Sequence, residues 1–372
     1  MFDFIPAQYY SLIYLLITTL FSLRAYINWQ KKTCNGILFG KNTNWPILLL
    51  FCALFVWIIG NRPIIAAFGD TYFYAHSFGL AKGGILAIPE SQHGDWLFNL
   101  LMVFCAQTMD YHGFFVVVEA GYIFFALWGI ARIFRNNTYG AMLFFFGAFS
   151  FFTYGVNGIR NGLATSIVIL AISFLLEDKP IGKIIGLFWC FVAISIHKSA
   201  ILPCACTILA IFVKNPKYSF GFWLASIILY LVAGNIIGDF FASLGFDDRM
   251  SNYMENTEEY SERFKSGFRI DFLVYSAMPI WLGYEVLIKK KMQSKYFPIL
   301  YNAYIYANAF WVMVMGVAYS NRFAYLSWFL YPLVLAYPCL KLNVWGEKQG
   351  KIAASIMGTH LGFTLFMEFI YY

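Results

Sequence analysis

The sequence predicts an all-α polytopic membrane protein with about twelve transmembrane helices, in a range of about 11–13. Hydrophobic residues make up 60% of the chain and charged residues only 12%, about half the charged share of soluble domains. The mean hydropathy is +0.65, and the apolar residues come in runs close to the roughly 20 that cross a bilayer. These observations exclude a soluble protein, and we expect residues 1–372 to form a single transmembrane domain.

The apolar runs define the individual spans. The first run has no basic stretch before it and no small-residue cleavage site after it, which indicates an uncleaved span rather than a signal peptide. Segment 95–109 is apolar but short, so we expect a re-entrant or interfacial element, and segment 239–270 is expected to be an external, periplasmic loop. The predicted spans are 9–27, 45–60, 114–132, 140–157, 161–176, 181–196, 199–213, 219–238, 271–288, 296–316, 323–340 and 351–371.

The positions of lysine and arginine set the orientation, because cytoplasmic loops carry an excess of both. With the N-terminus outside, all but nine of the 26 lie on the cytoplasmic side. The loop IKKKMQSK, residues 288–295, is the strongest signal, and counting 95–109 as a crossing would place it outside. The nine external residues are Arg62, Lys82, Arg160, Lys198, Arg249, Arg263, Lys265, Arg269 and Arg322.

Three external basic residues interrupt apolar runs. The stretch FVAISIHKSAIL lies in a run, 184–213, that would be about 45 Å long as one helix, whereas the hydrocarbon core is about 30 Å thick. We therefore expect the chain to turn near His197–Ser199, with Pro203 in the first turns of the next helix. The stretches TYGVNGIRNGLATS and AYSNRFAY interrupt two further runs at Arg160 and Arg322.

External basic residues oppose the topology signal, so they indicate another role, such as binding an anionic ligand. Helix N-termini that begin after the breaks add partial positive charge at the same depth, which favours a recessed cavity for a sugar or phosphate group. A structural interpretation stays open for each residue. Arg160, Arg322 and Lys198 would then snorkel to lipid headgroups, and His197 would be a hydrogen-bonded packing residue. Ionisable groups at membrane depth are nevertheless functional candidates by default.

The sequence has no pattern typical of a metal, disulfide or nucleic-acid site. Its seven cysteines include no C-x-x-C pair, and neither H-E-x-x-H nor D-x-D occurs, so we expect no metal and no cofactor. Inner-loop lysines rather than a basic groove account for the net charge of +7, which argues against binding to nucleic acid.

Four stretches, in order, resemble the EpsG-type and Wzy-type polysaccharide polymerases. NRPIIAAFGDTYFY, residues 61–74, resembles the family's R…GDT..Y opening, and GIRNGLATSIVILAISFL resembles its R-[QN]-G-x-A helix. SIHKSAIL is similar to its H-x-S element, and NRFAYLSWF to its late R-x-x-x-Y helix. The resemblance covers about residues 61–329, with Asn161 standing where glutamine is common and 239–270 matching no family pattern.

This resemblance implies a multi-pass glycosyltransferase of the bacterial cytoplasmic (inner) membrane with its active site facing the periplasm. Such enzymes transfer a glycan from undecaprenyl pyrophosphate to a sugar hydroxyl on the next lipid-linked repeat unit, and so polymerise O-antigen, capsule or exopolysaccharide. The implied partners are undecaprenyl-pyrophosphate-linked glycans, membrane lipid and a chain-length regulator protein. The family's motif residues correspond to Arg62, Asp70, Tyr74, Arg160, His197 and Arg322.

The reaction assigns roles to these positions. Arginine forks bind phosphate oxygens in pairs and stay protonated, so Arg160 and Arg322 are candidates to hold the departing pyrophosphate. The acceptor hydroxyl needs a base; His197 is the candidate because histidine titrates near neutral pH, with Asp70 competing, and binding of the diphosphate by cationic His197 also stays open. We expect the substrate to be bound by Arg62, Tyr74, Asn161, Lys198, Tyr260, Arg263, Asn321 and Tyr325.

Other interpretations remain open at the level of the sequence. An O-antigen ligase uses the same lipid donor with lipid A core as acceptor, and only the motif match separates it from a polymerase. A flippase would place ionisable groups near mid-membrane at a repeat interface; Glu119 and Glu285 do lie within spans, but most such groups gather at one face and no internal repeat is present. The loop that contains Tyr260 and Arg263 is either a lid over the acceptor glycan or a solvated amphipathic helix.

The orientation gives a testable prediction. A cysteine introduced by Gln293→Cys, in the loop 288–295, is expected to resist an impermeant maleimide in intact spheroplasts, because the positive-inside rule places this loop in the cytoplasm. Lys82→Cys, in the segment predicted to be external, is the matched control and should react in the same cells. Ready labelling of Gln293→Cys before lysis would reverse the orientation.

Overall fold

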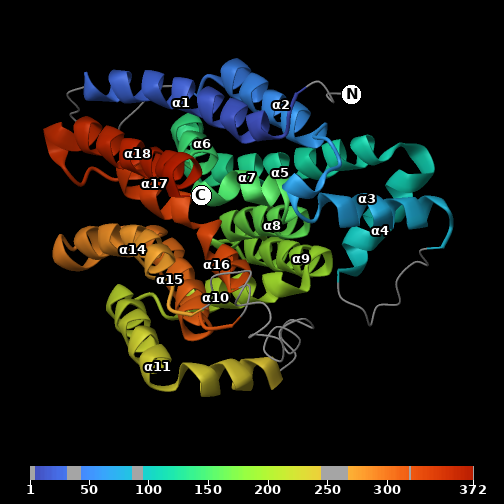
Figure 1. Cartoon of the computed structure of the whole chain (residues 1–372). Helices are drawn as coiled ribbons and strands as arrows, with labels where there is room; N and C mark the ends of the chain where they lie inside the picture. Colours follow the sequence, from blue (N-terminus) through green and yellow to red (C-terminus); the bar gives the residue numbers. More distant parts are fainter. Residues whose placement is uncertain (1–4, 32–42, 86–94, 244–266, 318–319, 372) are drawn as a thin grey trace. The chain divides into compact units, whose positions relative to one another are not determined.

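The computed structural model (Figure 1) describes most of the chain, namely residues 5–31, 43–85, 95–243, 267–317 and 320–371. Over these residues every regular element is a helix, which confirms the all-α class. By its internal contacts the chain divides into two compact units, one of residues 1–200 with 339–372 and the other of residues 201–338.

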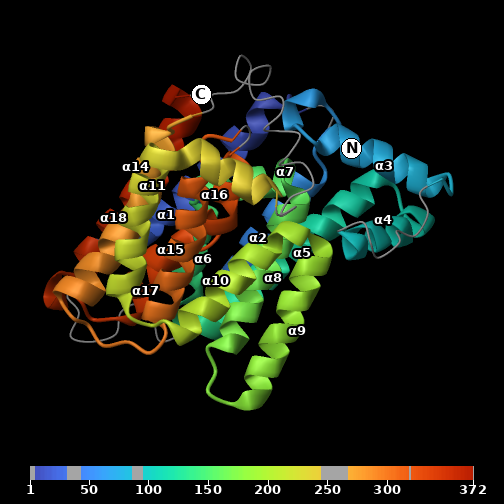
Figure 2. The same cartoon turned by 90° about the horizontal axis from the view of Figure 1, so that it is seen from below.

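The first unit is a bundle built around a helical hairpin. Its helices are α1 (Gln8–Gln30), α2 (Trp45–Gly60), α3 (Thr71–Lys82), α4 (Trp96–Thr108), α5 (Tyr111–Phe134), α6 (Thr138–Phe146), α7 (Phe149–Val156), α8 (Ile159–Leu175), α9 (Pro180–Ile196) and α18 (Gln349–Phe366). α8 packs between α5 and α9, α1 packs along α18, and α3 packs on α4, which also contacts α5 and α9 (Figure 2).

α8 is the core of the first unit, because every residue from Gly162 to Leu175 is buried. Glycines on both neighbours allow the close packing. A Cβ on Gly129 of α5 would lie 2.8 Å from the backbone of α8 at Ile169, and one on Gly186 of α9 would lie 2.6 Å from the side chain of Leu175. Only a residue without a Cβ permits such an approach, so α5, α8 and α9 form a tightly packed frame.

The predicted span 140–157 is wrong as a single helix, because the chain breaks between α6 and α7 at Gly147 and Ala148. Such a break frees carbonyl groups, which lipid cannot hydrate. Side chains from α1 and α18 bond to these carbonyls instead. The donors are Tyr14, His360 and Thr364, which bond to the carbonyl oxygens of Phe146, Phe144 and Gly147, respectively.

The second unit surrounds one buried helix. Its helices are α10 (Ile201–Phe212), α11 (Pro216–Ser243), α14 (Ile270–Gly283), α15 (Phe297–Met313), α16 (Asn321–Trp328) and α17 (Tyr331–Lys341), the last of which extends past the end of the unit at Pro338. α15 packs against α10, α11, α14 and α16. Its two buried amides are satisfied: Asn302 bonds to Ser219 and the carbonyl of Val213, and Asn308 to Trp223 and Ser327.

The chain is an integral membrane protein, but the described residues do not contain twelve full spans. Six helical stretches are long and apolar enough to cross a membrane: Gln8–Gln30, Tyr111–Phe146, Pro216–Gly234, Ile270–Lys289, Asn321–Lys341 and Gly346–Tyr371. Five other apolar helices have only 10–17 residues. Even 17 residues extend only about 25 Å as a helix, less than the hydrocarbon core of about 30 Å.

The predicted breaks are found where the charges lie. α9 ends at Ile196, a 3-10 turn covers Lys198–Ala200, and Pro203 lies in the first turn of α10. Arg160 is the second residue of α8, and Arg322 is the second residue of α16.

The two segments that were predicted not to be full spans, 95–109 and 239–270, compare differently with the structure. Segment 95–109 contains α4, a helix of 13 residues. The predicted loop 239–270 begins too early, because α11 continues to Ser243, and residues 244–266 lie outside the described part of the chain.

The packing of α5 on α8 gives a stability prediction. Gly129→Ala would force its Cβ against the backbone of Ile169, so we expect a loss of about 1–3 kcal/mol from overpacking. Gly362→Ala is the matched control, since a Cβ at this position of α18 meets nothing within 4 Å. Thermal unfolding of the two purified proteins in detergent measures the difference; equal midpoints would show that α5 and α8 are not closely packed.

Candidate functional site

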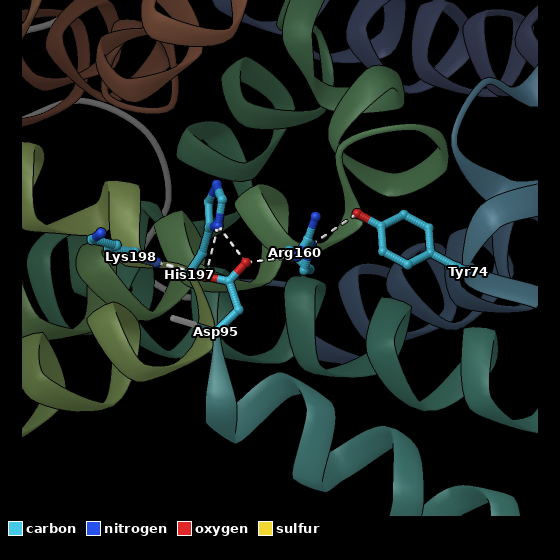
Figure 3. Close-up of polar contacts among 5 residues, drawn as sticks. All are labelled: Tyr74, Asp95, Arg160, His197 and Lys198. Atoms are coloured by element: carbon cyan, nitrogen blue, oxygen red, sulfur yellow. Dashed lines mark hydrogen bonds and ion pairs between the residues drawn. The ribbon is translucent and has the colours of Figure 1, made fainter. Parts of the chain in front are cut away.

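Two of the predicted breaks converge on one carboxylate, that of Asp95 (Figure 3). Arg160 donates from Nη1 to Oδ2 at 2.6 Å, and His197 Nδ1 lies 3.1 Å from Oδ1 and 3.2 Å from Oδ2. The backbone N–H of Lys198 donates to Oδ1 at 2.8 Å. Together with Tyr74, which bonds to Arg160, these residues are called the Asp95 cluster below.

The hairpin of α8 and α9 explains why Arg160 and His197 meet. The two helices pack side by side and are joined by a short turn at 176–179, so the start of α8 and the end of α9 lie at the same end of the pair. Arg160 stands in the first turn of α8. His197 follows the last residue of α9 in an extended conformation, with φ −151° and ψ 115°, which directs its ring out of the helix.

Asp95 reaches these residues from the start of α4. Its φ is 60°, in the left-handed region that aspartate adopts more readily than most residues. An aspartate at this position usually accepts a hydrogen bond from the first turn of its own helix, but Asp95 makes no such bond. Its carboxylate serves α8 and α9 instead, and so joins α4 to the hairpin.

Tyr74 brings α3 to the same site. Arg160 donates from Nε to the hydroxyl of Tyr74 at 3.1 Å, and its guanidinium carbon lies 5.5 Å from the centre of the ring. Asp70, one turn earlier, interacts electrostatically with Arg160. The N–H of Asp70 donates to Oδ1 of Asn157 at 2.9 Å, which attaches the start of α3 to the break before α8.

The surroundings keep Asp95 ionised. Burial by itself would raise the pKa of Asp95, since it disfavours the charged form. This pKa is nevertheless lowered to about 2, because burial is outweighed by the hydrogen bond and charge of His197, the charge of Arg160 and the N–H of Lys198. Asp95 is therefore a carboxylate at neutral pH.

An ionised Asp95 fixes the tautomer of His197. A carboxylate can only accept hydrogen bonds, so Nδ1 of His197 carries the hydrogen, and in the neutral ring Nε2 has a free lone pair. Within the described residues Nε2 makes no hydrogen bond, and neither does Nη2 of Arg160. In Figure 3 the second ring nitrogen and one guanidinium nitrogen point to the same side, away from Asp95. The histidine side chain is only 11% exposed and the arginine side chain 27%.

The other predicted substrate-binding residues of the first unit lie around this cluster. Asn161 follows Arg160 in α8, and its Oδ1 is buried without a hydrogen-bond partner in the described structure. The side chain of Lys198 points away from Asp95 (Figure 3), so only its backbone joins the cluster. Arg62 is fully buried, and within the described residues its hydrogen bonds go to other parts of the first unit rather than to the Asp95 cluster.

The remaining predicted residues lie elsewhere. The first turns of α16, in the second unit, contain the partly exposed residues Asn321, Arg322 and Tyr325. Tyr260 and Arg263 lie outside the described residues. Over the part of the chain that the structure describes, no group of three or more His, Cys, Asp or Glu side chains is arranged to hold a metal ion.

Sequence reasoning missed Asp95, the centre of the site. The available signal was weak but real: an acid directly before WLFNLLMVFCAQT, the apolar segment that is too short to span, on the same predicted face as Arg160 and His197. External cations that gather at one face favour a nearby anion. Asp95 is an acidic residue on that face, at the edge of a short helix.

Comparison with known proteins now adds to this geometry. A model of the EpsG family matches residues 44–371, a range that includes the whole Asp95 cluster. No curated protein and no solved structure gives a significant match. The match covers most of the chain and all four stretches on which the resemblance was based, so the resemblance is confirmed. The chain belongs to the EpsG family, a Wzy-like family of polysaccharide polymerases.

Proposed function

We propose that this protein polymerises undecaprenyl-pyrophosphate-linked oligosaccharide repeat units into a surface polysaccharide at the outer face of the cytoplasmic membrane. The growing glycan moves from its lipid pyrophosphate to a sugar hydroxyl of the next lipid-linked unit. Membership of the EpsG family supports the reaction class. The single observation that carries the mechanism is the bond of His197 to Asp95 beside Arg160.

His197 acts as the base. Its Nε2 takes the proton of the acceptor hydroxyl as the hydroxyl oxygen attacks the anomeric carbon of the donor glycan. Asp95 holds Nδ1, which orients the ring and stabilises the imidazolium that forms, the role that the buried aspartate has in a hydrolase triad. We prefer His197 to Asp70 as the base because its ring is anchored at one nitrogen and free at the other.

Arginine stabilises the leaving group. As the bond between the anomeric carbon and the diphosphate oxygen breaks, negative charge returns to the diphosphate, and donors that are already in place stabilise it without reorganisation. Arg160 offers Nη2 while its other nitrogens are held by Tyr74 and Asp95. Arg322 supplies the second guanidinium, and Asn161, Lys198, Asn321 and Tyr325 contact the glycans or the diphosphate.

The base assignment is tested by His197→Gln and Asp95→Asn in cells that lack the chromosomal copy. We expect the rate at which long glycan chains appear to fall about 10²–10⁴-fold for His197→Gln, the usual contribution of a general base. Asp95→Asn should also be severely impaired. Because the pKa of Asp95 is about 2, no acid limb of a pH–rate profile above pH 4 should arise from it.

His76→Gln is the matched control for this experiment. His76 lies on the exposed side of α3, two residues from Tyr74, and should tolerate the change. Protein amounts in the membrane are compared for all variants. A normal ladder of chain lengths from His197→Gln would show that His197 is a packing residue and would end the proposed mechanism.

The arginines are tested by the pattern of products as well as by the rate. Arg160→Ala and Arg322→Ala should each lower the rate about 10²–10³-fold and leave glycans of one repeat unit, because attachment and export of single units do not need a polymerase. Arg24→Ala, on an exposed position of α1, is the control. Loss of even the single unit would indicate a flippase or ligase, and a full ladder would exclude the two arginines from the reaction.

A further inference from the structure

Arg62 is a cation that the fold buries completely. Its exposed fraction is 0%, and each of its nitrogens donates within the protein. Nε bonds to Oγ1 of Thr71 at 3.1 Å, Nη1 to the carbonyl of Ile59 at 2.9 Å and Nη2 to the carbonyl of Val156 at 3.1 Å. Its guanidinium carbon lies 4.4 Å from the centre of the Phe115 ring. Because the side chain is fully buried and each of its nitrogens already donates inside the protein, this arginine is not exposed to a substrate.

These bonds join the two segments that carry Arg160 and Tyr74. Val156 is the last residue of α7, where helix carbonyls lose their partners, and its carbonyl accepts from both Arg62 and Thr71, the latter at 3.0 Å. Thr71 is the first residue of α3 and lies on the same helix face as Tyr74, three residues later. The bond of Asp70 to Asn157 adds a further link beside it.

Glu119 is the acidic residue that interacts electrostatically with Arg62. It lies on α5, is 2% exposed, and is close enough to Arg62 for electrostatic interaction. Its Oε1 has no hydrogen-bond partner in the described structure. A Cβ on Gly155 would come within 2.9 Å of Oε2, so the carboxylate lies directly against α7, one residue from Val156. A buried cation is costly unless it is paired. Glu119 is the acidic residue placed to pair with Arg62.

We propose that Arg62 is a positioning residue, which acts on the reaction only by holding α3 against the break before α8, and that Glu119 is its counter-charge. We call the bonds of Arg62 and Thr71 to the carbonyl of Val156 the clamp. Thr71 lies one helical turn before Tyr74 in α3, and Val156 ends α7, just before the break that precedes Arg160 in α8. It sets the angle at which Arg160 meets Asp95 and the diphosphate. This inference rests on the proposed function, and it replaces the expected contact of Arg62 with substrate.

A double-mutant cycle of Arg62→Lys and Tyr74→Phe tests the inference. Lysine keeps the charge but cannot make three directed bonds, so Arg62→Lys should lower the rate of chain formation about 10–100-fold through misplacement of Arg160. In the Tyr74→Phe background, where the Arg160 contact is already lost, the same change should cost about twofold or less. Effects that multiply instead would show that Arg62 acts independently of Arg160, and would overturn the proposal.

Three further variants separate folding from positioning. If Arg62→Lys does not accumulate in the membrane, Thr71→Val removes the second bond to Val156 without a change of charge, and the cycle is repeated with it.

Glu119→Gln should reduce the amount of folded protein, and Arg62→Met with Glu119→Gln should restore the amount but not the rate. Full recovery of the rate would overturn the proposal. Loss of even the single repeat unit in an Arg160→Ala or Arg322→Ala strain would refute the proposed function instead, whereas an unimpaired Arg62→Lys protein would refute only the clamp.

Discussion

The site depends on the carboxylate of Asp95. This carboxylate accepts four hydrogen bonds or ionic contacts from two helix ends, the start of α8 and the end of α9. Without this anion Arg160 and His197 would face each other as donors with nothing between them, in surroundings where an unpaired charge is costly. The carboxylate therefore does three things at once. It attaches α4 to the hairpin of α8 and α9, it fixes which nitrogen of His197 is free, and it holds one edge of a guanidinium whose other edge can meet a ligand.

The same physical constraint governs the rest of the first unit. Broken helices leave polar backbone groups that lipid cannot satisfy, and this unit breaks between α6 and α7, before α8 and after α9. At the first break, Tyr14, His360 and Thr364 bond to the free carbonyls. At the second and third, the bonds come from charged groups as well: Arg62 on Val156, and Asp95 on Lys198. The first break is therefore closed by neutral side chains that only pack helices together, whereas the second and third are closed by ionic groups in or beside the Asp95 cluster.

The sequence predicted the positions of the ionic breaks and missed the connections between them. Arg160 and His197 were recognisable because each is an ionisable residue inside an otherwise apolar run. Asp95 lies at the edge of its run and gave only a weak signal, and the break at Gly147 involves no charge, so both were missed. Arg62 was grouped with the other external arginines, because counting charges by side of the membrane cannot distinguish a buried arginine from one that lines a cavity. Pairing is a property of the folded chain.

The charges of the site explain why one arginine is insufficient for the proposed reaction. Arg160 is already matched by Asp95 and Asp70, and the neutral form of His197 required of a base adds no charge. A departing diphosphate brings more negative charge than the remaining nitrogen of Arg160 can balance, and Arg62 is fully buried with each of its nitrogens bonded inside the protein. A second cation is therefore needed. Lys198 joins the cluster through its backbone, whereas Arg322 repeats the placement of Arg160 at the second position of a short helix. There the helix N-terminus adds to the guanidinium charge, which is why the proposed function names Arg322 rather than Lys198 as the second cation.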